Sequence, residues 1–267
     1  MIQFPFRNVM KSRLLAPARV AFAVGLVLSF SAQSFAEVKV IISGGFSAAY
    51  QELLPQFERA TGISVLTTKG ASGGSGPESI GAQLGRGVPA DVVILNRPRL
   101  DELIKGGKII AGTDLDLAQT STGVAVRAGT PKPDISTVTA FRQTLLRAKV
   151  IAVTGSNAST IKELLSRLGV AGEVEVKVGG RFTESIAMVA RGDAVLAIQP
   201  VSEILHLPGV ELVGTVPTEL RPPAVFAAAI VSGSKELDAS KRLIEFLSSE
   251  SATAAIRRSG MEPSGRR

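Results

Sequence analysis

Residues 38–46 read VKVIISGGF, a β-branched apolar run that passes directly into a glycine-rich loop. Because Val and Ile favour extended backbone, residues 38–42 predict a buried strand. Beyond the loop, apolar side chains recur at the i, i+3, i+4 and i+7 spacing of one helix face. These side chains are Tyr50, Leu53, Leu54 and Phe57. A strand, a glycine-rich loop and an amphipathic helix in this order predict an α/β fold.

The alternation of strands and helices continues to the end of the chain. Pro55 lies inside the first helical pattern and is expected to kink or shorten that helix, which Gly62 is expected to end. Further strands are predicted at 63–68, 90–95, 124–127, 150–153, 173–178, 194–198 and 225–231. Further helices are predicted to begin at residue 78 and to span 99–105, 137–147, 160–168, 184–190 and 237–249.

The length of 267 residues fits two α/β lobes better than one very large sheet. We expect one lobe at residues 37–122 and 216–267 and the other at 123–215, each a mainly parallel sheet flanked by helices. The chain would then cross between the lobes twice.

Residues 1–36 have the pattern of a secretory signal peptide. They hold four basic side chains and no acid, an apolar run at 20–30, and small residues at Ser34 and Ala36, where a signal peptidase cleaves. The apolar run is too short for a membrane-spanning helix, which needs about 20 residues. We therefore expect residues 37–267 to be exported to the periplasm, without stable membrane insertion after cleavage.

Charge and composition exclude several classes of function. The formal net charge is +7, but residues 1–36 contribute four positive charges and residues 257–267 hold four Arg and one Glu, so residues 37–256 are neutral overall. With one Tyr and no Trp, the chain lacks the basic face and stacking aromatics of a nucleic-acid-binding protein. It has no Cys and a single His, His206, so a zinc site is not expected, and no cofactor is expected.

Three loops, each between a strand and a helix, are rich in Gly, Ser, Thr and Asn. A helix start presents free N–H groups and a partial positive charge, so three such loops at one edge of the sheets would hold an anion without Lys or Arg. Plain helix capping is the alternative for each loop by itself. None has the order of a phosphate-binding loop, so nucleotide binding is unsupported. The residues concerned are Ser43, Gly44, Gly45, Ser72, Gly73, Ser156, Asn157, Ala158 and Ser159.

With these loops the sequence resembles the molybdate-binding proteins of bacterial ABC importers and the wider group of type II periplasmic binding proteins. The most specific stretch is Gly-Val-Pro-Ala-Asp at 87–91, followed by Val-Val-Ile. Residues 191–198, RGDAVLAI, fit the family as well. The resemblance implies two lobes with an anion in the cleft between them, and it implies that Ser72, Ala158 and Ser159 line this cleft.

Two positions depart from the molybdate binders. Gly45 stands where they usually carry a serine, and Ile198-Gln199-Pro200 stands where they usually carry a tyrosine. Each lost hydrogen bond to a charged ligand costs about 1.5–3 kcal/mol. Ser43 or Gln199 would have to compensate for the missing donors.

The opening loop and the stretch Gln199-Pro200-Val201-Ser202-Glu203 also resemble a branch that contains periplasmic aconitate isomerase. This branch implies a larger polycarboxylate ligand, which a cleft opened at Gly45 would suit, and an allylic proton transfer. Lys69, Arg97 and Arg181 are candidate charge partners near the loops, with solvated surface charges as the alternative. Asp, Glu or His206 would be the general base, and the sequence does not choose among them.

Two functions follow from these observations, and an exported sensor input protein is a third interpretation that shares the binding chemistry of the first and differs only in its partner. The first is a solute-binding protein that closes around a small anion for an ABC importer, with the importer's permease as partner. The second is an isomerase that interconverts trans- and cis-aconitate in the same fold. A monomer is expected in both cases.

Overall fold

The computed structural model describes residues 36–74, 76–205, 207–221 and 223–264. The predicted signal peptide therefore lies outside the described residues, apart from Ala36. Residues 36–264 belong to one compact unit that contains two mixed α/β sheets. No helix of the described residues is long and apolar enough to cross a membrane.

The first sheet has six strands in the order β11-β4-β10-β3-β1-β2. β1 pairs in parallel with β2 and β3, whereas β10 runs antiparallel to both β3 and β4. The strands are β1 (Glu37–Ile42), β2 (Ser64–Lys69), β3 (Val92–Asn96), β4 (Leu115–Thr120), β10 (Ala224–Ile230) and β11 (Glu262–Pro263).

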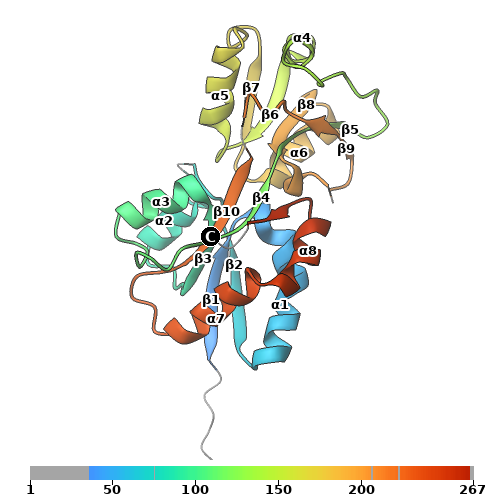
Figure 1. Ribbon diagram of the computed structural model, residues 1–267. Helices are drawn as coiled ribbons and strands as arrows, with labels where there is room; N and C mark the ends of the chain where they lie inside the picture. Colours follow the sequence, from blue (N-terminus) through green and yellow to red (C-terminus); the bar gives the residue numbers. More distant parts are fainter. Residues whose placement is uncertain (1–35, 75, 206, 222, 265–267) are drawn as a thin grey trace, which may run out of the picture. The chain divides into compact units, whose positions relative to one another are not determined.

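Helices cover both faces of the first sheet, as Figure 1 shows. On one face, α1 (Ser47–Thr61), α7 (Leu237–Leu247) and α8 (Thr253–Arg258) enclose a core that includes Phe57 and Phe226. On the other face, α2 (Ile80–Gly85) and α3 (Arg97–Lys105) cover a second apolar cluster.

The second sheet has five strands in the order β7-β6-β8-β5-β9. Phe141 of α4 and Ile161 of α5 belong to the core on one of its faces, and Ile186 of α6 belongs to the core on the other. The strands are β5 (Thr122–Arg127), β6 (Val150–Thr154), β7 (Glu175–Gly179), β8 (Leu196–Pro200) and β9 (Val210–Thr215). The helices are α4 (Val138–Ala148), α5 (Ala158–Arg167) and α6 (Phe182–Arg191).

Both sheets are mixed, so the expectation of mainly parallel sheets needs correction. In the second sheet β6 is parallel to β7 and β8, but β5 is antiparallel to β8 and β9. Strands β4, β5, β9 and β10 flank the two places where the chain passes from one sheet to the other. Of these, β10 and β5 run against the direction of the βα units, whereas β4 and β9, each antiparallel to one of them, run with it. The passages lie at 121 and between Thr215 and Ala224; the lobe boundaries at 122 and 216 stay a prediction.

Most predicted elements are present within a few residues of their expected bounds. The first helix is not shortened at Pro55, because α1 continues through it to Thr61. Tyr50, Leu53 and Phe57 are buried, and this packing outweighs the missing backbone hydrogen bond of about 3 kcal/mol. As expected, Gly62 ends the helix and donates its N–H to the Glu58 carbonyl at 2.9 Å.

Candidate functional site

A pocket of about 210 Å³, called here the first chamber, lies at the carboxyl ends of strands from both sheets. In open α/β sheets this edge is where ligands bind. β1, β2 and β6 end at the chamber, and the 3₁₀ turn η2 (Val201–Glu203) after β8 reaches it as well. The lining of the first chamber includes Ser43, Gly44, Lys69, Ser72, Thr154, Ser156, Arg181, Phe182 and Glu203.

The first two predicted loops contribute hydroxyl groups to this chamber. Ser43 is buried, and its Oγ has no hydrogen-bond partner among the described residues. Its backbone N–H is already used, since it donates to the Ile94 carbonyl at 2.9 Å. Ser72 is also buried, and its Oγ accepts the backbone N–H of Asn96 at 3.1 Å. Ser43 therefore offers a free hydroxyl, while Ser72 is oriented by β3.

The third loop reaches the chamber through its first residues only. Ser156 lines the chamber, with its Oγ 3.0 Å from the Thr154 Oγ1. Asn157 points to a neighbouring pocket. Ala158 packs against the core of the second sheet, and Ser159 is exposed and lines neither pocket. The loop therefore turns away from the chamber once α5 begins.

Gly45 does not open the cleft, contrary to the interpretation of the sequence. A Cβ placed on Gly45 would lie 1.9 Å from Cζ of Phe226, so the aromatic ring of β10 already fills the space that a side chain would take. Gly73 is similar, because a Cβ there would lie 2.7 Å from Nε of Arg99. Gly45 makes room for a side chain of β10 and Gly73 for a side chain of α3, and neither glycine lines the first chamber.

Gln199 is fully buried and does not line the chamber. Its side-chain amide donates to Ser185 Oγ at 2.6 Å, and its Oε1 has no partner among the described residues. Gln199 thus holds the start of α6 in place, where Phe182 lines the chamber.

The three candidate cations lie in different surroundings. Lys69 is exposed at the wall of the first chamber. Arg181 lines it too and forms an ion pair with Glu78, which belongs to the loop before α2. Because Glu78 belongs to the first sheet's half of the chain, this pair joins loops from both sheets at the chamber.

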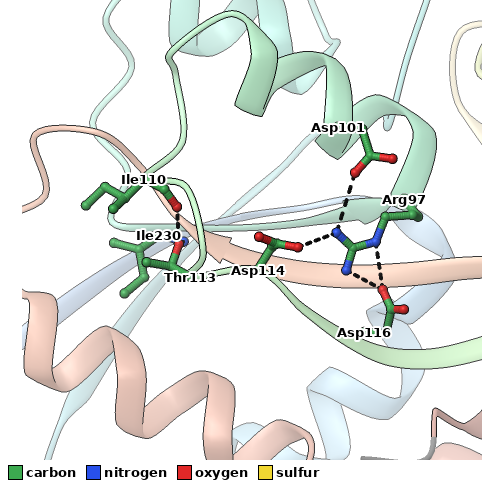
Figure 2. Close-up of polar contacts among 7 residues, drawn as sticks. All are labelled: Arg97, Asp101, Ile110, Thr113, Asp114, Asp116 and Ile230. Atoms are coloured by element: carbon green, nitrogen blue, oxygen red, sulfur yellow. Dashed lines mark hydrogen bonds and ion pairs between the residues drawn. The ribbon is translucent and has the colours of Figure 1, made fainter. Parts of the chain in front are cut away.

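Arg97 is occupied by acids of its own sheet, as Figure 2 shows. Its Nη1 lies 2.6 Å from Asp114 Oδ2 and 3.5 Å from Asp101 Oδ1, and it also pairs with Asp116. Burial lowers the pKa of Arg97, but the hydrogen bonds that it donates to Asp116 and Asp114 outweigh burial and raise the pKa. Arg97 therefore ties α3 to the start of β4.

The group that the sequence did not single out is Glu203, in η2. Only 8% of Glu203 is exposed, and its Oε2 has no hydrogen-bond partner among the described residues. Burial raises the pKa of this carboxyl to about 8. A Cβ on Gly44 would lie 2.4 Å from Cδ1 of Phe182 and 3.2 Å from Oε1 of Glu203, so Gly44 leaves room for the Phe182 ring first and for the carboxyl as well. In sequence, the signals for Glu203 are its place in the stretch Gln199-Pro200-Val201-Ser202-Glu203, which resembles the aconitate isomerase branch, and the position of an acid soon after a buried strand.

A second pocket of about 420 Å³, called here the second chamber, adjoins the first. Ser72, Ser156 and Glu203 line both chambers. Buried acids with raised pKa values in a pocket are typical of proton-transfer sites. The arrangement therefore combines neutral hydroxyl donors with one carboxyl group that can hold or release a proton near neutral pH.

Known proteins resemble this chain over almost its whole length. Aconitate isomerase from Pseudomonas sp is 34% identical over 255 residues, which cover 92% of this chain and 97% of that protein. The molybdate-binding protein ModA from Azotobacter vinelandii is 26% identical over 257 residues, covering 91% and 96% of the two chains. The resemblance seen in the sequence is therefore confirmed.

The fold agrees with that of type II periplasmic binding proteins. The structure of the periplasmic molybdate-binding protein from Azotobacter vinelandii matches with a TM-score of 0.67 and 20% identity, over 86% of this chain and all of that one. A family model described as bacterial extracellular solute-binding protein matches residues 38–262. The chain belongs to this family of bacterial extracellular solute-binding proteins.

Proposed function

We propose that the protein is an isomerase that moves a carbon–carbon double bond in an aconitate-like unsaturated polycarboxylate, with Glu203 carrying the proton. The observation that carries this proposal is the buried, unpartnered carboxyl of Glu203 at the wall shared by both chambers. The 34% identity to an aconitate isomerase supports the same activity.

The reaction needs one group that accepts a proton and returns it. Ionised Glu203 takes a proton from the methylene carbon next to the double bond, and the electron pair of the C–H bond forms a new double bond to the central carbon. The old double bond opens, and its outer carbon receives a proton from the protonated Glu203. No atom is lost or gained, and the double bond has moved by one position. A positioned carboxyl with a pKa near the working pH suits both steps.

The same carboxyl is a disadvantage in a pocket built only to hold an anion, whether a tetrahedral oxyanion or a polycarboxylate. A negative charge on Glu203 would repel a dianion a few ångströms away, and burial strengthens this repulsion. An oxyanion would have to bind the protonated form. An enzyme that alternates between the two protonation states uses the group directly.

The proposed activity is tested by proton NMR on the protein expressed from the full chain. trans-Aconitate is expected to convert to cis-aconitate, and in D₂O the methylene and vinyl positions are expected to take up deuterium. Spectra that stay unchanged at high protein concentration would exclude the isomerase.

Ser72→Ala tests whether the first chamber holds the ligand. Calorimetry is expected to show about 10-fold weaker binding of cis-aconitate, because a hydroxyl donor to a charged ligand is lost. Ser159→Ala is the matched control, since Ser159 is exposed and lines neither chamber, and its affinity is expected to stay at the parent value. Equal affinities for both variants would mean that the ligand lies elsewhere.

A solute-binding protein of the periplasm, serving an ABC importer, is the second candidate. The hydroxyls of Ser43, Ser72 and Ser156 in the first chamber favour it, since neutral donors suit an oxyanion. Titration with molybdate, tungstate and sulfate distinguishes the two: heat from an oxyanion, together with no aconitate turnover, supports the binding protein.

A further inference from the structure

Arg221 is a partly buried cation in the segment between β9 and β10, and it lines the second chamber. Its Nη2 donates to Asn157 Oδ1 at 3.2 Å. Its Nη1 is buried and has no hydrogen-bond partner among the described residues. Burial lowers the pKa of this guanidinium.

The other two arginines of the second chamber differ from Arg221 in their partners. Arg97 is paired with Asp114 and Asp116, and Arg99 pairs with Glu102 at 2.8 Å. No salt bridge to Arg221 is present among the described residues. Because a buried charge without an opposite charge is costly, the site is complete only when an anion enters it.

The position of Glu203 between the chambers connects Arg221 to the chemistry. Glu203, Ser72 and Ser156 form the wall common to both chambers. A ligand that extends from the hydroxyls of the first chamber to Arg221 therefore passes the carboxyl group. A ligand with a single small anionic group would fill only one chamber.

We propose that Arg221 is a specificity-determining residue that binds one carboxylate of the ligand, so that a polycarboxylate spans both chambers with its carbon skeleton beside Glu203. The planar guanidinium forms paired hydrogen bonds with a carboxylate, which a lysine does not. This inference rests on the proposed function for the class of the ligand, and it adds the site that selects a ligand with several carboxylates over a ligand with one.

The test measures binding of tricarballylate, a saturated tricarboxylate, and of crotonate, a monocarboxylate, by calorimetry on the protein expressed from the full chain. Arg221→Gln is expected to weaken tricarballylate binding by about 10–100-fold. The preference for tricarballylate over crotonate is expected to shrink in this variant, because crotonate needs only one of the two sites. Arg99→Gln is the control, since Arg99 lines the same chamber but is paired with Glu102.

A purely structural role for Arg221 would lower the melting temperature and weaken both ligands in the same proportion. An unchanged preference between the two ligands, or equal losses in the Arg221 and Arg99 variants, overturns the inference. If Arg221→Gln does not fold, as judged by circular dichroism, Arg221→Lys decides, because it keeps the charge but loses the paired hydrogen bonds. A Kd for Arg221→Lys equal to the parent value then overturns the inference.

Tricarballylate has no double bond, so its binding does not depend on catalysis. Binding that requires Arg221, together with no conversion of trans-aconitate, would refute the isomerase and leave the carboxylate site standing. If the protein converts trans-aconitate but Arg221→Gln binds tricarballylate as tightly as the parent does, the carboxylate site alone is refuted.

Discussion

Glu203→Gln is expected to lower kcat for aconitate isomerisation by about 10²–10⁴-fold, the usual contribution of a positioned acid–base group. Glutamine has nearly the same shape as glutamate but cannot accept a proton from carbon. Binding of tricarballylate is expected to persist or to improve, because the variant removes a negative charge from the site. Steady-state kinetics and calorimetry check both results, and full activity in the Gln variant would exclude Glu203 as the proton carrier.

The pH dependence of the parent protein provides a second measure of the same group. The ionised form of Glu203 removes the proton, so kcat/KM is expected to rise with pH and level off above the pKa of about 8. A profile of kcat/KM that stays flat between about pH 6 and about pH 9, a range that includes the pKa of about 8, would contradict the assignment.

Glu203→Gln is also expected to stabilise the protein at alkaline pH. Burial raises the pKa of Glu203 from 4.5 to about 8, so in this window the native state keeps a proton that the unfolded state has released. Stability of the parent therefore falls as pH rises from 4.5 to 8 and is level above it, with a total loss of at most about 5 kcal/mol. Denaturant unfolding is expected to show the Gln variant more stable at pH 8 and the two proteins similar near pH 5.

Gly45→Ser is expected to destabilise the protein by about 1–3 kcal/mol or more, without creating an oxyanion site. Serine is the residue that molybdate binders usually carry at this place, but here its Cβ would meet the ring of Phe226 at 1.9 Å. Phe226 is only 2% exposed and belongs to the core of the first sheet, so the ring has little freedom to move. Urea unfolding measures the loss.

A double-mutant cycle shows whether the ring is the cause. Phe226→Ala alone is expected to cost about 3–5 kcal/mol, because it removes a buried aromatic side chain. In the Phe226→Ala background, Gly45→Ser is expected to lower the free energy of unfolding by much less than it does in the parent, because the clash with the ring is gone. Additive losses would mean that Gly45 is required for its backbone alone.

The elements of the fold were largely predictable because their signals are local. Strand 38–42 and the helix face from Tyr50 to Phe57 can be recognised from periodicity, and packing maintains α1 even across Pro55. β4 was missed, since Leu115–Thr120 alternates polar and apolar residues weakly, and β9 (Val210–Thr215) was anticipated only as a strand without bounds after the turn predicted at 205–209. Both strands are held mainly by pairing with neighbours distant in the sequence.

The sequence predicted the site residues that lie in the loops directly after strands, but not the roles of its charged groups. Ser43, Gly44, Ser72 and Ser156 lie at the first chamber because the carboxyl ends of strands converge there. The roles of charged groups depend on partners far along the chain, which no local pattern shows. Arg97 pairs with acids 17 and 19 residues away.

The contact between Gly45 and Phe226 also bears on how this family can change its ligands. Phe226 lines the second chamber, and the same ring occupies the space above Gly45. A serine at position 45 of this chain would therefore require a smaller side chain at position 226. A serine at position 45 alone would clash with the Phe226 ring, and a smaller residue at position 226 alone would leave a cavity in the core. Positions 45 and 226 are sterically coupled in this chain, so the residue at position 45 says little about the ligand unless the residue at position 226 is considered with it.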